Sequence, residues 1–230
     1  MSVFRQIMIA KATGGNDTIW EVSRTTAITY RFSALGHVDW GDGTSTDYDT
    51  WYSGNTYNAE HTFEPGTFRI TVSGKEHGVQ HGNPVNVKFY PVRLVQIGTD
   101  IMHCYRLFMS CSNVVLADGV RIPDISSIAS MLAGTAITSL PASMKIPASV
   151  TSANGAFQNC TKLGSVATGV FDNLLHATHS VDVRSMLSGC VDLAGVAPAL
   201  WTNPLLTQHT GCFAGCTKLD NYDDIPADWK

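Results

Sequence analysis

The sequence predicts a mainly β protein with short helices, in which an N-terminal β-sandwich precedes a C-terminal solenoid of about five units. Two observations carry this prediction. Residues 1–88 contain short runs rich in Val, Ile, Thr and aromatic residues, broken by Gly, Asn and Asp. Residues 89–230 instead repeat a pattern of large apolar and small residues every 24 to 30 positions.

The composition is that of a folded globular chain. Of 230 residues, 44% are hydrophobic and 15% are charged, so the low hydrophobicity and high charge of disordered chains are absent. The net charge is −4 and Lys and Arg form no cluster, which excludes the electrostatic signature of nucleic-acid binding. No apolar run approaches the ~20 residues of a membrane-spanning helix, so we expect no membrane insertion.

The first region reads as an antiparallel sandwich. Its β-type runs are "FRQIMIA", "TIWEVSR", "AITYRFS", "HVDWGDGT", "TFRITVSG" and "VNVKFYPV". The character of the sequence changes between Gly82 and Pro91, so we divide the chain into residues 1–88 and 89–230.

Two segments of this region resemble the PKD-type immunoglobulin-like domain. They are "DWGDGT", within Val38–Thr44, and "HTFEPGTFRITVSG", which spans His61–Gly74. The resemblance implies a strand that ends in an Asp-Gly turn, followed later by a hairpin that carries the histidine segment.

The second region is organised by three columns of residues. The first column is large and apolar: Phe108, Leu132, Phe157, Leu187 and Phe213. The second, three residues later, is small: Cys111, Thr135, Cys160, Cys190 and Cys216. The third, six residues after the first, is Val114, Thr138, Leu163, Leu193 and Leu219, with apolar Ile137 beside Thr138. Small or polar residues precede the second column: Ser110, Gly134, Asn159, Gly189 and Gly215.

Such units cannot bury their own apolar face and therefore stack on their neighbours. Within a unit we expect a short helical turn, as in "RSMLSGC", then a short strand and a return that carries proline. The cysteines, which include Cys104 and Cys212, are expected as free buried thiols, with disulfides between adjacent units as the alternative. Cys212 and Cys216 lack the spacing of a zinc site.

"LFMSCSNV", "AFQNCTKL", "MLSGCVDL" and "CFAGCTKL" resemble the units of BspA-like leucine-rich repeats. The resemblance covers about Val92 to Lys230. That family occurs in bacterial surface proteins and phage virion proteins, and it implies a recognition surface without catalytic residues.

Polar clusters in the sequence favour structural roles over metal binding. The loop "DWGDGTSTDYD" lacks the calcium pattern of an EF-hand, and Asp-Gly favours a turn. The pairs His77 and His81, and His176 and His179, are expected in loops or at the surface. No catalytic motif is present, so we expect no enzyme activity, no metal and no cofactor.

The segment "DYDTWYSGNTYN", residues 47–58, has the composition of a recognition loop, with aromatics among small polar residues. We assign Trp51, Tyr52 and Tyr57 as candidate ligand-binding residues. The alternative is that these side chains alternate on a strand and that half of them lie in the sandwich core.

These features predict a non-enzymatic phage virion protein, such as a fibre tip, a receptor-binding subunit or a capsid-decorating subunit. Its partners would be other virion proteins or a host-surface glycan or protein, and its location the virion surface. A bacterial surface adhesin or secreted binding module is the alternative, which the lack of an export signal disfavours. A glycan-active enzyme ranks last.

The final unit bears on assembly, because terminal repeats need a cap. Either Tyr222 and Trp229 fold over this unit, or another subunit covers it. We therefore expect a homo-oligomer or docking on a larger assembly.

Overall fold

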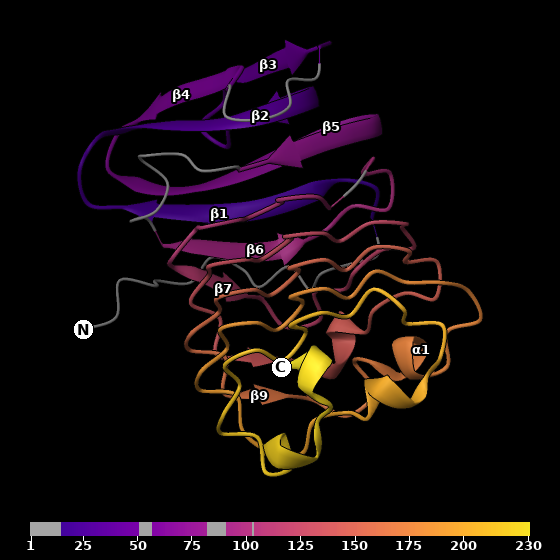
Figure 1. The fold of residues 1–230 in the computed structure, drawn as a ribbon. Coiled ribbons are helices and arrows are strands. Elements are labelled where there is room, and N and C mark those ends of the chain that lie inside the picture. Colours follow the sequence, from indigo (N-terminus) through magenta and orange to yellow (C-terminus); the bar gives the residue numbers. More distant parts are fainter. Residues whose placement is uncertain (1–14, 51–56, 82–90, 103) are drawn as a thin grey trace.

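The computed structural model describes residues 15–50, 57–81, 91–102 and 104–230. The protein is mainly β, with 31% strand and 8% helix. Figure 1 shows the strands of the N-terminal part layered at one end of the molecule. The remaining chain leads away from them in successive turns, and the C-terminus lies in this second part.

Among the described residues, seven strands form the main sheet: β1 Thr18–Arg24, β2 Ile28–Asp39, β3 Ser45–Tyr48, β4 Ala59–Phe63, β5 Gly66–Gln80, β6 Val92–Gln96 and β7 Val114–Leu116. Two short strands form a separate pair: β8 Ser139–Leu140 and β9 Ser165–Val166. The described helices are equally short: α1 Asp172–Leu175 and the 3-10 turns η2 Ala142–Met144, η3 Leu200–Thr202, η4 Tyr222–Asp224 and η5 Ala227–Trp229.

The main sheet is mixed and joins the two regions of the chain. Its order is β3-β2-β5-β1-β6-β7, and β4 pairs with β2. Strands β1 to β5 pair antiparallel, β6 runs antiparallel to β1, and β7 runs parallel to β6. The sheet therefore continues from residues 18–80 into residues 92–116. The expected boundary at residues 88 and 89 lies outside the described residues.

Strand β2 pairs with three other strands and contains a bulge where its register changes. Its first half pairs with β4 and its second half with β3 and β5, with a register shift at Gly36. Gly36 has φ +104°, and a Cβ there would lie 2.3 Å from the carbonyl oxygen of Ser73. Only glycine fits, because this position combines a left-handed backbone with close approach of β5.

Residues 104–230 form five repeats, which we number by their first-column residues Phe108, Leu132, Phe157, Leu187 and Phe213. Each repeat donates backbone hydrogen bonds to the next. The first-column N–H groups of Phe108, Leu132, Phe157 and Leu187 donate to the carbonyls of Met131, Ala156, Met186 and Cys212 at 2.8–2.9 Å. In the same four repeats, the N–H groups of the residues two before and two after the first column also donate to carbonyls of the next repeat.

Two backbone positions in each repeat are left-handed. The residue before the second column has φ between +58° and +77° in all five repeats: Ser110, Gly134, Asn159, Gly189 and Gly215. The residue two before the first column has φ between +51° and +65°: Arg106, Ser130, Gly155, Ser185 and Gly211. Small or polar residues are favoured at such positions because a Cβ crowds the backbone there, and Arg106 is the bulky exception.

The expected helical turn is made of i to i−3 bonds. In repeat 4, the N–H groups of Met186 and Cys190 donate to the carbonyls of Val183 and Leu187. In two of the returns that carry proline, the proline directly precedes a 3-10 turn: Pro141 comes before η2 and Pro226 before η5.

The last repeat is covered by the end of the chain itself. The N–H groups of Gly211 and Phe213 donate to the carbonyls of Asp228 and Trp229 at 3.1 and 2.8 Å. The Trp229 ring stacks on His209 with centroids 4.3 Å apart, and it is 4% exposed. Trp229 therefore covers repeat 5 as one of the two expected capping modes, and coverage by another subunit stays a prediction.

The buried apolar residues of both regions form one core. At the junction, Phe108 of repeat 1 packs against Trp20 of β1, with ring centroids 5.7 Å apart. The mainly β character with few short helices is thus shown. The finer layout, a sandwich followed by a leucine-rich-repeat solenoid, stays a prediction.

The bulge gives a matched pair of substitutions. Gly36→Ala and Gly43→Ala both place a Cβ on a left-handed backbone, but only Gly36 has a neighbour within 4 Å. We expect Gly43→Ala to lower the free energy of unfolding by about 1–2 kcal/mol, and Gly36→Ala to lower it clearly further. Urea denaturation measures both, and equal losses would contradict the bulge geometry.

Candidate functional site

The proposed recognition loop is only partly described. Trp51 and Tyr52 lie outside the described residues, and Tyr57 is partly buried. Burial, followed by the nearby Cys111, raises the pKa of Tyr57. The side chain of Asn58 exchanges hydrogen bonds with the backbone of Ala34 at 2.8 and 2.9 Å. The end of the loop is therefore fastened to β2 through Asn58.

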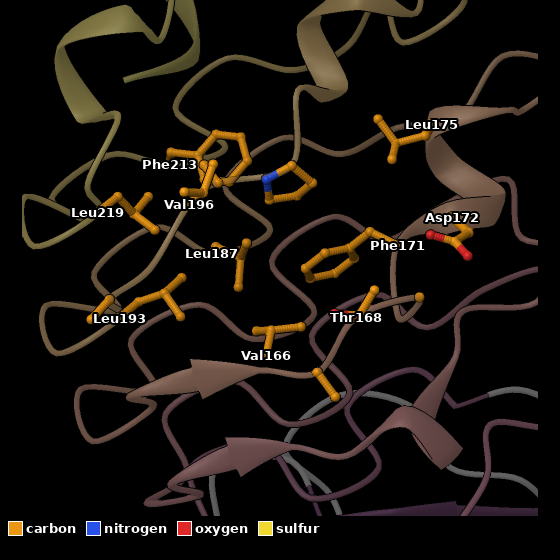
Figure 2. A pocket seen from close by; sticks show the side chains of 15 residues that line it. Val166, Thr168, Phe171, Asp172, Leu175, Leu187, Leu193, Val196, Phe213 and Leu219 are labelled. Carbon is orange, nitrogen blue, oxygen red and sulfur yellow. The ribbon is translucent and has the colours of Figure 1, made fainter.

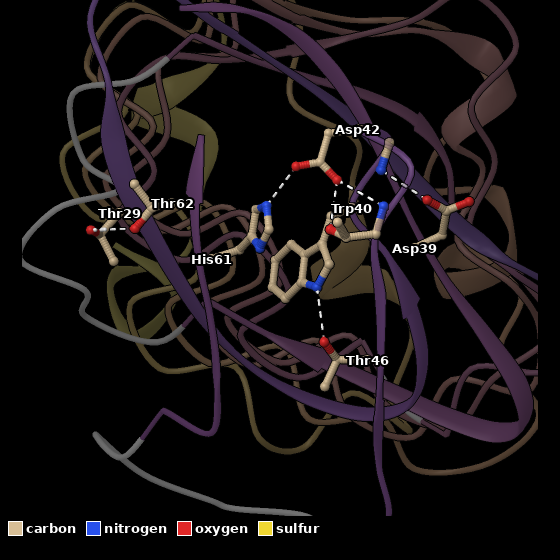
Figure 3. Close-up of polar contacts among 9 residues, drawn as sticks. Thr29, Asp39, Trp40, Asp42, Thr46, His61 and Thr62 are labelled. Atoms are coloured by element: carbon tan, nitrogen blue, oxygen red, sulfur yellow. Dashed lines mark hydrogen bonds and ion pairs between the residues drawn. The ribbon is translucent and has the colours of Figure 1, made fainter. Parts of the chain in front are cut away.

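The two segments that resemble the PKD-type domain meet in space (Figure 3). His61 of β4 stacks on Trp40 with ring centroids 4.7 Å apart, and its Nε2 lies 2.6 Å from Oδ2 of Asp42. Trp40 Nε1 donates to Thr46 Oγ1 at 3.3 Å. The cluster thus fixes the Asp-Gly turn against β4.

Asp39 and Asp42 act as turn-forming carboxylates. Asp39 Oδ1 accepts from the Gly41 N–H, and Asp42 Oδ1 accepts from the Thr44 N–H and hydroxyl. Burial opposes ionisation of Asp42, but the hydrogen bonds from Thr44 and His61 outweigh it, so its pKa is lowered. Within the described ranges, no three His, Cys, Asp or Glu side chains are grouped to hold a metal ion.

The expectation of loop or surface histidines is wrong for His77, and His81, which lies outside the strand, is not at the surface. His77 lies in β5, His81 follows its end, and both are fully buried. His77 Nε2 is 2.9 Å from Thr18 Oγ1. The flanking glycines indicated a loop, but Gly78 continues the strand opposite Leu35 of β2. Of the other pair, His176 is exposed, and His179 Nε2 lies 3.0 Å from the carbonyl of Val150.

His81 connects the sheet to repeat 1. Its Nδ1 is 2.5 Å from the carbonyl of Leu107, and its Nε2 is 2.9 Å from the Tyr30 hydroxyl. A carbonyl can only accept, so Nδ1 carries the proton and Nε2 accepts from Tyr30. The ring stacks on Phe108, with centroids 4.3 Å apart. Burial lowers the pKa of His81 to about 4, against the smaller opposing effect of the Leu107 bond.

The six cysteines are free and buried. In the second column, Cys160, Cys190 and Cys216 donate from Sγ to the carbonyls of Leu132, Phe157 and Leu187, at 3.1–3.2 Å. Each thiol thus bonds the first-column residue of the preceding repeat. Burial raises the pKa of all six thiols, to about 12 for Cys104 and about 11 for Cys216. A neutral, buried thiol is a poor nucleophile or metal ligand.

The residues proposed as the repeat core are all buried: Phe108, Cys111, Leu132, Phe157, Cys160, Leu163, Leu187, Cys190, Leu193, Phe213, Cys216 and Leu219. In repeat 2, Ile137 is buried and Thr138 is exposed, so the buried third-column position lies one residue earlier than in the other repeats.

A pocket of about 260 Å³ opens between repeats 3 and 4. Figure 2 shows Leu187, Leu193 and Val196 on one side of it, and Thr168, Phe171 and Leu175 on the other. Asp172 is the one charged residue in its lining. Sequence reasoning missed this pocket, although the spacing of 30 residues between Phe157 and Leu187 marks the longest repeat.

No family model, curated protein or solved structure matched the chain. Among the described residues, no helix has the length and apolar character needed to cross a bilayer.

The buried histidine makes folding stability depend on pH. The unfolded chain takes up a proton on His81 near pH 6.5, whereas the folded protein does so only near pH 4. His81 therefore stabilises the fold fully above pH 6.5, and this contribution is lost as the pH falls toward 4. We expect urea denaturation to show a loss of about 3 kcal/mol across this interval.

Long-range ¹H–¹⁵N spectra of the imidazoles check the cause directly. His81 should remain a neutral Nδ1–H tautomer at pH 5. A charged His81 at pH 5, or equal stability at pH 7 and pH 4.5, would contradict the buried geometry.

Proposed function

We propose that the chain is a non-enzymatic recognition protein, built from an immunoglobulin-like sandwich of the PKD type and BspA-like leucine-rich repeats. Its setting is a phage virion, as a fibre-tip, receptor-binding or capsid-decorating subunit. The motifs that favour this assignment are the "DWGDGT" turn with His61, and the four units of the type "AFQNCTKL".

The observation that carries the proposal is the continuity of the hydrogen-bonded framework. The sheet passes from β3 to β7, and the backbone bonds between repeats continue from Arg106 to Trp229. A framework joined in this way holds its exposed side chains in fixed relative positions, which lowers the entropy cost of binding a partner. The thiols and the two buried histidines serve packing and hydrogen bonding, which fits a structural use of these groups.

The partners would be other virion proteins, or a glycan or protein of the host surface. Docking on a larger assembly or self-association belongs to the same proposal. Because Trp229 covers repeat 5, self-association does not need to use that end of the stack. A bacterial surface adhesin or secreted binding module is the alternative setting for the same framework.

Immunogold electron microscopy with antibodies against the purified chain tests the setting. We expect gold on intact phage particles from a lysate, with labelling abolished when the antibodies are first absorbed with the purified chain. Gold on intact bacterial cells, with none on particles, would replace the virion assignment with the adhesin. Labelling of neither would overturn the display role.

A further inference from the structure

The pocket between repeats 3 and 4 arises from an interrupted ladder. Strand β9 of repeat 3 pairs with β8 of repeat 2, and Ala194 of repeat 4 donates to the carbonyl of Gly164 at 3.2 Å. Beyond this point the contact stops: no backbone hydrogen bond joins residues 166–169 to residues 196–198, all of which are described. The chain of repeat 4 therefore diverges from the edge of β9.

Asn221 of repeat 5 accounts for the divergence. Its side chain accepts from the Ala197 N–H at 2.8 Å and donates to the Ala197 carbonyl at 3.3 Å. The backbone groups of Ala197 are thus used by repeat 5 and do not face β9. Helix α1, in the longest repeat, supplies the facing wall of the pocket through Asp172 and Leu175, together with Phe171 just before the helix.

The lining chemistry defines the class of ligand. Buried Leu187, Leu193 and Phe213 belong to the lining, and Val196 in the same lining is 73% exposed. Val196 therefore offers the accessible apolar surface that a ligand can cover, whereas the buried residues form the floor beneath it. The volume, about 260 Å³, is below the ~300–1,000 Å³ of sites for drug-sized ligands. It therefore suits a single ring system.

The charged residue of the lining, Asp172, already has a cationic neighbour. Asp172 Oδ2 lies 3.9 Å from Lys145 Nζ, and both side chains are about half exposed, at 51% and 47%. Exposed pairs of this kind contribute little to stability, so a basic group of a ligand can take up the same carboxylate.

We propose that this pocket receives one aromatic side chain from an extended segment of a partner protein, with a Lys or Arg beside it that pairs with Asp172. The segment lies along residues 166–169, on the side where no backbone hydrogen bond joins them to residues 196–198 of repeat 4. The inference names a partner for the proposed recognition role and rests on that role for its biological setting.

The test titrates the ¹⁵N-labelled chain with three capped tripeptides and follows amide shifts by NMR. Acetyl-Lys-Trp-Lys-amide supplies the ring and the charge, acetyl-Glu-Trp-Glu-amide reverses the charge, and acetyl-Lys-Ser-Lys-amide removes the ring. We expect saturable shifts at Val166 and Val196 with the first peptide, with a dissociation constant on the order of 1 mM. The second should bind about twofold to fivefold more weakly, and the third should not bind.

Two variants at exposed valines locate the site. Val196→Lys places a cation at the pocket and should abolish binding of the Lys-Trp-Lys peptide. Val191→Lys is the matched control, because Val191 is 46% exposed but does not line the pocket, and it should bind like the wild type. Asp172→Asn should remove the preference between the two Trp peptides and leave the ring's contribution intact.

Absence of saturable shifts with either Trp peptide would overturn the proposal, as would unchanged binding in Val196→Lys. Equal binding of the two Trp peptides to the wild type would overturn the role of Asp172. Stronger binding of free tryptamine than of the Lys-Trp-Lys peptide would assign the pocket to a small aromatic amine and overturn the peptide partner. Particle labelling is independent of all these results, so failure of the pocket and failure of the display role are distinguishable.

Discussion

The structure depends on one constraint: in repeats 1 to 4, three backbone N–H groups at and around the first column are bonded by carbonyls of the repeat that follows. Unpaired N–H groups in a buried backbone are costly, so no repeat is complete by itself. The chain must then return to the same register after each turn, and the two left-handed residues per repeat provide the change of direction. Residues 226–230 take the place of a sixth partner and end the series.

The same constraint explains how the two regions are joined. The first repeat needs a surface on the side opposite repeat 2, and the sheet supplies it: β7 extends β6, and Phe108 packs on Trp20 and His81. Strand β7 thereby covers the edge of β6, which would otherwise be open to pairing with another chain. We infer that the two regions unfold together, since one core and one sheet run through both.

Part of the fold could be predicted from the sequence, because turn motifs and a repeating pattern can be recognised in a single sequence. The columns of Phe157 and Cys160 and the small residues before the cysteines follow from a repeating environment. The burial of His81 could not be predicted, since it depends on Tyr30 and Leu107, which are distant in sequence. The pocket depends on the hydrogen bonds between Asn221 and Ala197. These bonds are not part of the repeating pattern, so the pattern does not predict the pocket. The composition of the candidate loop does not reveal that Asn58 fastens its end to β2.

Hydrogen exchange of the native protein tests the central constraint most directly. The amides of Phe108, Leu132, Phe157, Leu187 and Phe213, which are 24 to 30 residues apart, should be strongly protected and should exchange with one common opening free energy. Exposed amides such as Val191 should exchange at rates close to those of an unfolded chain. If the five amides exchange as fast as Val191, or open independently of one another, the repeats are not joined by the hydrogen bonds described and the account fails.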